Sequence, residues 1–220
     1  MKFLANILVM AFLFAAALLY SDYLVAEECY FADALYWMSE IEMDARKDSE
    51  FDKELIRRGM SPSAPLFQAQ PARTVGAYMG KCYEGDRWSI QHGPFIVGGI
   101  ETKDEHPEFG VYTLRGDTLG YAALVGYKIP ITGSVTAKPK FGLNGSFSEY
   151  NVHSFVTNEK RELIVESHES IKDFNTGLVL GFDLVFRDRY KFGCLYLKDF
   201  GDTDTLGSEE KYSCGAGVIF

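Results

Sequence analysis

The residues with the clearest capacity for chemistry are two histidines that stand beside serines. These are His153, which precedes Ser154, and His168, which lies in the stretch "ESHES" at 166–170. A hydrolase needs a serine and a histidine within hydrogen-bond reach, and an acid that orients the histidine. Adjacent residues of an extended segment point to opposite faces, so His153 and Ser154 do not suit direct proton transfer. The sequence therefore predicts a protein that is not an enzyme and has no catalytic residues.

Signals for cofactors are equally weak. The four cysteines, Cys29, Cys82, Cys194 and Cys214, are not spaced as metal ligands. The glycines do not form a loop that would cradle a phosphate. We therefore expect no metal and no cofactor. The net charge of −9 at pH 7 would repel a phosphate backbone, which argues against a nucleic-acid partner.

The elements that must position any site are strands. Aromatic residues make up 15% of the 220-residue chain and glycine contributes 21 residues, while the mean hydropathy is only −0.08. This composition is typical of strands, tight turns and aromatic girdles, and not of a helical membrane bundle. From Thr74 onward, most segments alternate apolar and polar residues. Eight strands are predicted, at 74–84, 88–101, 109–116, 119–129, 135–150, 177–187, 191–199 and 211–220.

The pattern predicts an all-β fold: an eight-stranded antiparallel up-and-down β-barrel that spans a membrane and occupies residues 73–220. In strand 177–187 one face is fully apolar, from Leu178 to Phe186, whereas the other carries small residues and Asp183. Lipid outside and a polar lumen inside require this arrangement. We expect a network of charged side chains in the lumen, in which Lys140 and Asp183 take part; its members are Lys128, Lys138, Lys140, Asp183 and Arg187.

Two alternatives concern the barrel itself. Alternation alone also fits a soluble barrel of the lipocalin kind, in which the apolar face points inward. The lysines could instead line a narrow pore for anions, although side chains just fill the interior of an eight-stranded barrel. Charges on the glycine-rich face, Tyr and Phe near the strand ends, and a chain that stops at an aromatic residue all favour the membrane barrel.

The first 72 residues differ from the rest. Lys2 and the apolar run from Phe3 to Tyr20 indicate a signal peptide that ends at residue 26, with an uncleaved membrane anchor as the alternative. In residues 27–60, apolar residues recur at helical spacing, and a segment rich in Ser, Pro and Ala follows. We therefore expect residues 27–72 to form a helical extension and a linker.

The end of the chain carries a family resemblance. The stretch "GLVLGFDLVFRDRYKFGCLYLKDFGDTD" and the closing "KYSCGAGVIF" resemble the end of the OmpA-like and opacity-type outer-membrane β-barrels. This resemblance implies a bacterial outer-membrane location among membrane lipids. It also implies an assembly signal that the barrel-assembly machinery recognises, in the alternating residues Tyr212, Cys214, Ala216, Val218 and Phe220. Cys194 departs from the family's inward charge at that position.

The connections carry the functional expectation. If the chain ends on the periplasmic side, the two longest connections, 151–176 and 200–210, face outward, and two of the three periplasmic ones are short. The segment "TKDEHPE" would be periplasmic and "GDR" would face outward. We expect a non-enzymatic role in envelope integrity or in surface interaction with an unknown ligand. A lipid-modifying barrel enzyme that uses His153 or His168 is the alternative.

Because Cys194 is assigned inward and Cys214 outward, no disulfide is expected between them.

Overall fold

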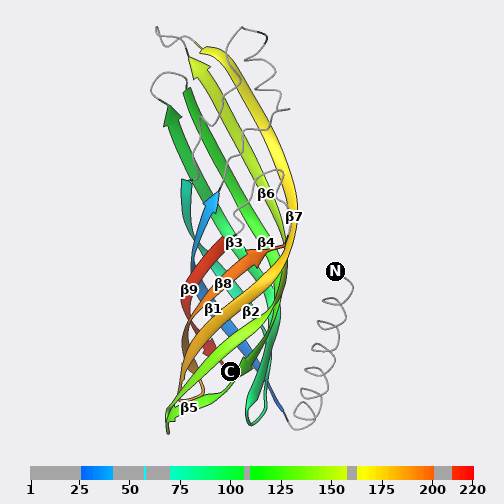
Figure 1. Cartoon of the computed structure of the whole chain (residues 1–220), viewed down its shortest axis with the longest axis vertical. Coiled ribbons are helices and arrows are strands. Elements are labelled where there is room, and N and C mark those ends of the chain that lie inside the picture. Colours follow the sequence, from blue (N-terminus) through cyan, green and yellow to red (C-terminus); the bar gives the residue numbers. More distant parts are fainter. Residues whose placement is uncertain (1–25, 42–56, 58–69, 107–109, 158–162, 201–209) are drawn as a thin grey trace, which may run out of the picture.

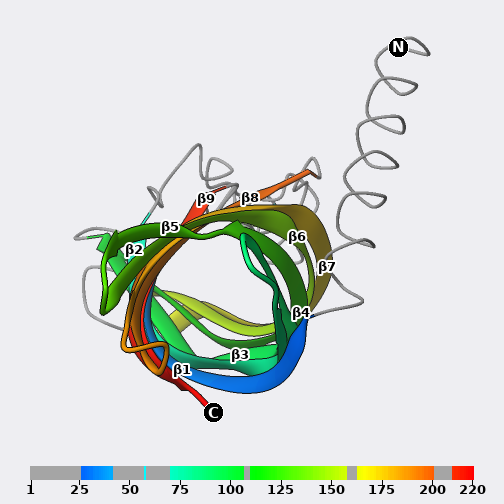
Figure 2. The ribbon, with the colours of Figure 1, turned by 90° about the horizontal axis from the view of Figure 1, so that it is seen from below.

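Eight long antiparallel strands close into a barrel in the computed structural model, which describes residues 26–41, 57, 70–106, 110–157, 163–200 and 210–220. The strands are β1 Glu27–Ile41, β2 Gln70–Glu84, β3 Trp88–His106, β4 Gly110–Tyr127, the short β5 Ile129–Thr132, β6 Val135–Thr157, β7 Leu163–Phe186, β8 Tyr190–Asp199 and β9 Glu210–Ile219. Strands that follow one another in the chain pair with each other, except that β4 pairs with β6 and not with β5. Pairing of β1 with β9 closes the ring, which Figure 2 shows along the barrel axis.

The first strand corrects the prediction of a helical extension over 27–72. Residues 27–41 form β1, and β2 begins at Gln70. In β1, Phe31, Leu35 and Trp37 are buried inside the barrel, whereas Tyr36 and Met38 are exposed on the outer surface. Apolar side chains on both faces hide the period of two, so the spacing of these residues resembles that of a helix. The signal peptide predicted at 1–26 and most of the predicted helix and linker lie outside the described residues.

A second correction concerns the strands predicted at 109–116 and 119–129. They form one strand, β4, and Gly116 pairs with Ile100 and Tyr150 inside the sheet instead of starting a turn. A Cβ at Gly116 would collide with the ring of Tyr150, so the glycine marks close packing. The prediction omitted β1 and divided β4 in two. These two errors cancel, so the predicted total of eight barrel strands is correct.

Three turns lie at the end of the barrel that also holds the C-terminus. The turns between β2 and β3, around β5, and between β7 and β8 gather there with the C-terminus (Figure 1). The assignments of "GDR" to the outer side and of "TKDEHPE" to the periplasmic side were therefore wrong, because the split of β4 reversed the direction of β3. Short turns on the periplasmic side and longer connections outside are the rule for outer-membrane barrels.

The apolar rows face outward, as predicted. Leu178, Leu180 and Phe182 are about half exposed, whereas Asp183, Val179 and Val185 are buried inside. The outer row continues on the neighbouring strands, with Phe141, Leu143, Leu119, Tyr121 and Phe192. An apolar outer belt around a charged interior is the inverse of a soluble barrel. Among the described residues, no helix is long and apolar enough to cross a membrane. The described strands therefore form a closed β-barrel whose apolar outer face suits a membrane-spanning protein.

Candidate functional site

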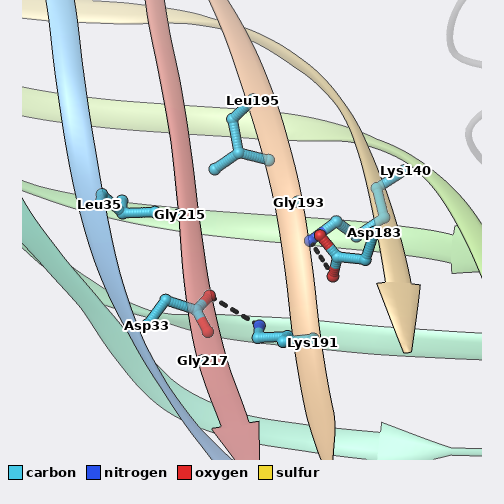
Figure 3. A pocket seen from close by; sticks show the side chains of 9 residues that line it. All are labelled: Asp33, Leu35, Lys140, Asp183, Lys191, Gly193, Leu195, Gly215 and Gly217. Atoms are coloured by element: carbon cyan, nitrogen blue, oxygen red, sulfur yellow. Dashed lines mark hydrogen bonds and ion pairs between the residues drawn. The ribbon is translucent and has the colours of Figure 1, made fainter. Parts of the chain in front are cut away.

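The middle of the barrel interior holds two buried ion pairs side by side (Figure 3). Lys140 of β6 and Asp183 of β7 lie 2.6 Å apart, with 3% and 5% of their side chains exposed. Lys191 of β8 and Asp33 of β1 also lie 2.6 Å apart. All four line one small cavity, which has room for about one water molecule. Four strands thus contribute two positive and two negative charges to one neutral layer, which we call the central charge layer.

Glycines make room for these carboxylates. Gly193 lies opposite Asp183 on the paired strand, and Gly217 lies opposite Asp33. A Cβ at either glycine would collide with a carboxylate oxygen of the paired aspartate. The inward glycines of β8 and β9 are therefore part of the central charge layer, because any larger residue would displace its acids.

Further ion pairs lie at the two ends of the interior. At the end with the short turns, Glu84 of β2 binds Lys138 at 2.8 Å and Lys128 at 2.6 Å. At the other end, Lys211 of β9 and Asp199 of β8 are 2.7 Å apart and buried. The structure thus gives each described interior lysine an acidic partner.

Of the residues predicted for the network, the structure brings Lys140 and Asp183 together and places Lys128 and Lys138 on one shared acid. Arg187 is the exception. It occupies the exposed turn between β7 and β8, where Arg187 and Asp188 both have a positive φ. Such a pair is typical of a two-residue type I′ hairpin, and Arg187 is exposed there instead of joining the lumen network. The sequence reasoning missed Asp33, Glu84, Lys191, Asp199 and Lys211, although Lys191 and Asp199 share the inward parity of Gly193.

Aromatic side chains fill the interior next to these charges. The rings of Phe31 and Tyr78 meet edge to face at 4.6 Å, and those of Trp37 and Phe95 stack at 6.0 Å. The Tyr78 hydroxyl of β2 donates a hydrogen bond to the carbonyl of Ala122 on β4, two strands away. Large rings and paired charges together give the described interior the character of a packed core.

Two disulfides join neighbouring strands, and one of them contradicts the sequence-based expectation. Cys194 lies directly opposite Cys214, and the two are bonded. The expectation was wrong because Cys194 faces outward with Phe192, not inward. The second bond joins Cys29 of β1 to Cys82 of β2, whose side chain is fully buried. One disulfide thus faces the membrane side and the other faces the interior.

The C-terminal row lies on the outer surface. Tyr212, Ala216, Val218 and Phe220 are exposed, and Cys214 is half-buried in its disulfide. The backbone of Phe220 forms two hydrogen bonds with Tyr30, and their rings stack at 6.3 Å. The strand end that was predicted as the assembly signal is thus fixed against β1 in the closed barrel. Its recognition by the barrel-assembly machinery stays a prediction.

The outer hairpin, by which we mean residues 149–157 of β6 and 163–172 of β7, extends past the apolar belt. Phe147 and Phe174 pair on the outer face of the belt, and the next outward pair is Glu149 with Lys172, 3.4 Å apart. The change from rings to charges marks the edge of the hydrocarbon region. Both strands continue beyond this edge, as Figure 1 shows.

Three polar side chains meet on the outer face of this hairpin. His153 lies opposite His168, and their rings stack in parallel at 4.2 Å. Oε1 of Glu166 lies 3.0 Å from Nε2 of His153 and 3.2 Å from Nε2 of His168. These two hydrogen bonds hold the pKa of Glu166 below its usual range. The hydroxyl of Ser170 donates to Glu149 at 3.5 Å, so it is not aligned with either histidine as a nucleophile would be.

Comparison with known proteins finds only distant structural similarity. No protein-family model matches the chain, and no curated protein matches it. Among solved structures, Ail, the attachment invasion locus protein of Yersinia pestis, shares 14% identity over 88% of this chain and 100% of its own, with a TM-score of 0.40. Neisserial surface protein A shares 12% identity over 86% of this chain and 95% of its own, with a TM-score of 0.43. OprG, an outer membrane protein from Pseudomonas aeruginosa, shares 12% identity over 89% of this chain and 97% of its own, with a TM-score of 0.39.

Proposed function

We propose that this chain is a non-enzymatic surface-interaction protein of the outer membrane, in which the barrel is an anchor and the outer hairpin makes the contacts. The observation that carries this proposal is the length of β6 and β7, which have 23 and 24 residues. A transmembrane strand needs only about 9 to 11 residues. The remaining half of each strand has no role in crossing the membrane and is available to a partner.

The outer part of β7 has a strand edge that indicates how the hairpin would bind a partner. Pairing between β7 and β8 ends at Gly177 and Asp199, and no described strand pairs with β7 between Leu163 and Asn175 on that side. An open strand edge offers backbone donors and acceptors to an extended segment of another protein. Polar outward residues on the same strand keep this edge soluble.

The packed interior supports an anchor in preference to a pore. The central charge layer and the rings beside it occupy the width that an ion path would need, so we expect no conductance from the purified protein in planar bilayers. The proposal also holds that the histidines of the outer hairpin do not modify lipids. Cells that carry His153→Ala or His168→Ala should therefore contain the same lipid A, by mass spectrometry, as cells with the unaltered protein.

The direct test shortens the outer hairpin. Residues 152–169 are replaced by an Asn-Gly turn, which retains the ladder up to the pair Asn151 and Ser170. Bacteria that express either form are compared for adherence to cultured epithelial cells and for resistance to bile-salt detergent. We expect the shortened form to lose adherence and to retain detergent resistance. Equal adherence of the two forms would refute a surface role, and a loss of detergent resistance alone would assign the hairpin to envelope integrity.

The matched control is Gly133→Ala in the turn before β6, where a Cβ would have no neighbour within 4 Å. This variant should adhere as the unaltered protein does. Heat-modifiable gel mobility of all three proteins confirms that each barrel is folded, so that a loss of adherence is assigned to the hairpin itself.

A further inference from the structure

We propose that His153, Glu166 and His168 form a binding site for a divalent transition-metal ion, of which Zn²⁺ is the natural candidate, on the outer face of the outer hairpin. One ligand atom from each residue is available, and these atoms all lie within 4.8 Å of one another. The site depends on neither the adhesive role nor the open strand edge, since it follows from the geometry of the three side chains.

The backbone fixes the relative position of the three residues. His153 and His168 are directly opposite in the antiparallel ladder, and Glu166 is two residues before His168, so it emerges on the same face. Cross-strand neighbours of this kind keep a constant separation. The three ligands are therefore held by two hydrogen-bonded strands and not by a loop, which limits the ordering that a metal ion would have to impose.

The distances match the size of a small coordination sphere. In a tetrahedral zinc site with bonds of roughly 2.0–2.1 Å, two ligand atoms lie about 3.3 Å apart. The two nitrogen-to-oxygen distances here are 3.0 and 3.2 Å. Both Nε2 atoms already point at one carboxylate oxygen, so an ion inserted between them would replace two hydrogen bonds by coordinate bonds. Each imidazole would then carry its proton on Nδ1, as a neutral zinc ligand does.

The ligand set determines the class of ion. Two imidazoles and one carboxylate suit Zn²⁺, Cu²⁺ or Ni²⁺, whereas Ca²⁺ and Mg²⁺ require a shell of oxygen atoms. The side chains of His153, Glu166 and His168 are 37%, 43% and 69% exposed, so an ion can reach them. Three protein ligands leave at least one position open for water or for a group from another molecule. The site has the ligand number of an exchangeable ion and not of a closed structural one.

Among the described residues, the charged groups near this site have partners of their own. They include Glu101 with Arg115, Glu149 with Lys172, and Asp117, which accepts a hydrogen bond from the backbone N–H of Gly99. Lys103 on β3 also has a partner. Metal binding displaces protons from its ligands, so the affinity for Zn²⁺ should fall as the pH is lowered below 7.5.

The test is calorimetric titration with ZnCl₂ of the full-length, untagged, folded protein in detergent, after treatment with a chelator. We expect about one Zn²⁺ per chain at pH 7.5, and a loss of affinity of about tenfold or more in His153→Ala, His168→Ala and Glu166→Gln. The control is His92→Ala, because His92 lies half-buried on the outside of the barrel and is hydrogen-bonded to Tyr121, away from the hairpin. This variant should bind as the unaltered protein does.

Two results would overturn the proposal. One is an unaltered protein that binds no Zn²⁺ at pH 7.5. The other is binding that survives in the double variant with His153→Ala and His168→Ala, which would place the ion elsewhere on the chain. Heat-modifiable mobility measured on each sample separates a lost site from an unfolded barrel.

Discussion

The pair formed by Lys140 and Asp183 gives the sharpest quantitative prediction. The atoms are 2.6 Å apart and the two side chains are 3% and 5% exposed. At an effective dielectric constant of 20, charges at this distance attract by about 6 kcal/mol, and desolvation offsets much of this energy. Removing one partner is costly because the other charge stays buried. Lys140→Met and Asp183→Asn should each lower the free energy of unfolding by about 3 to 5 kcal/mol.

A double-mutant cycle separates the ion pair from general damage. The variant with both substitutions leaves neither charge unpaired, so its loss should be smaller than the sum of the two single losses by about 1 to 3 kcal/mol. The control pair is Arg115 and Glu101, which is 70% and 54% exposed on the outside, and Arg115→Met should cost less than about 1 kcal/mol. The assay is urea unfolding in lipid vesicles, followed by fluorescence of the chain's two tryptophans. Additive losses, or single losses no larger than that of the control, would refute a coupled interior layer.

Three more predictions test other parts of the barrel. Gly193→Ala, whose methyl group meets the Asp183 carboxylate, should cost about 1 to 3 kcal/mol in the same urea assay, and an effect equal to that of Gly133→Ala, in open space, would contradict the close packing. Peptide mapping without reductant should recover Cys29 joined to Cys82 and Cys194 joined to Cys214, and free thiols at these positions would overturn the pairing. Removing the bond between Cys29 and Cys82, which spans 53 residues, should lower the free energy of unfolding by about 2 to 4 kcal/mol. Phe182→Arg should lower the free energy of unfolding in vesicles by about 2 to 4 kcal/mol, because it places a charge in hydrocarbon. Asn151→Arg on the outer hairpin should change this free energy by less than about 1 kcal/mol. Equal costs for the two variants would argue against the proposed membrane boundary.

Strands that face lipid on one side and charge on the other are readable from the sequence. The stretch from Gly177 to Phe186 has this contrast, and its orientation and its end near Phe186 were predicted. The start of the strand was not predicted, because β7 begins at Leu163, within the segment expected to be an outer connection. The first strand lacks the contrast, since Tyr36 and Met38 face lipid and Leu35 and Trp37 fill the interior. Hydrophobicity alone cannot assign a period when both environments accept apolar side chains.

The interior pairs depend on information that alternation does not contain. The lysines could be placed inside from their parity, but the partner of Lys191 is Asp33, which is 158 positions earlier in the chain and belongs to the missed strand. Only the closure of β9 onto β1 brings these two residues together. The cluster on the outer hairpin was likewise hidden, because the ring-to-ring contact of His153 and His168 follows from the register of β6 against β7.

Quenching of tryptophan fluorescence by lipids with brominated acyl chains tests the orientation of the barrel wall most directly. Trp88→Phe leaves Trp37 as the sole tryptophan, inside the barrel and 4% exposed. Leu180→Trp, made with Trp37→Phe and Trp88→Phe, places the sole tryptophan on the outer row. Paired residues of β7, β8, β9 and β1 connect Leu180 to Met38, the neighbour of Trp37, so the two probes lie on one ladder. We expect strong quenching at position 180 and weak quenching at Trp37, and the reverse order would contradict a barrel whose apolar rows contact lipid.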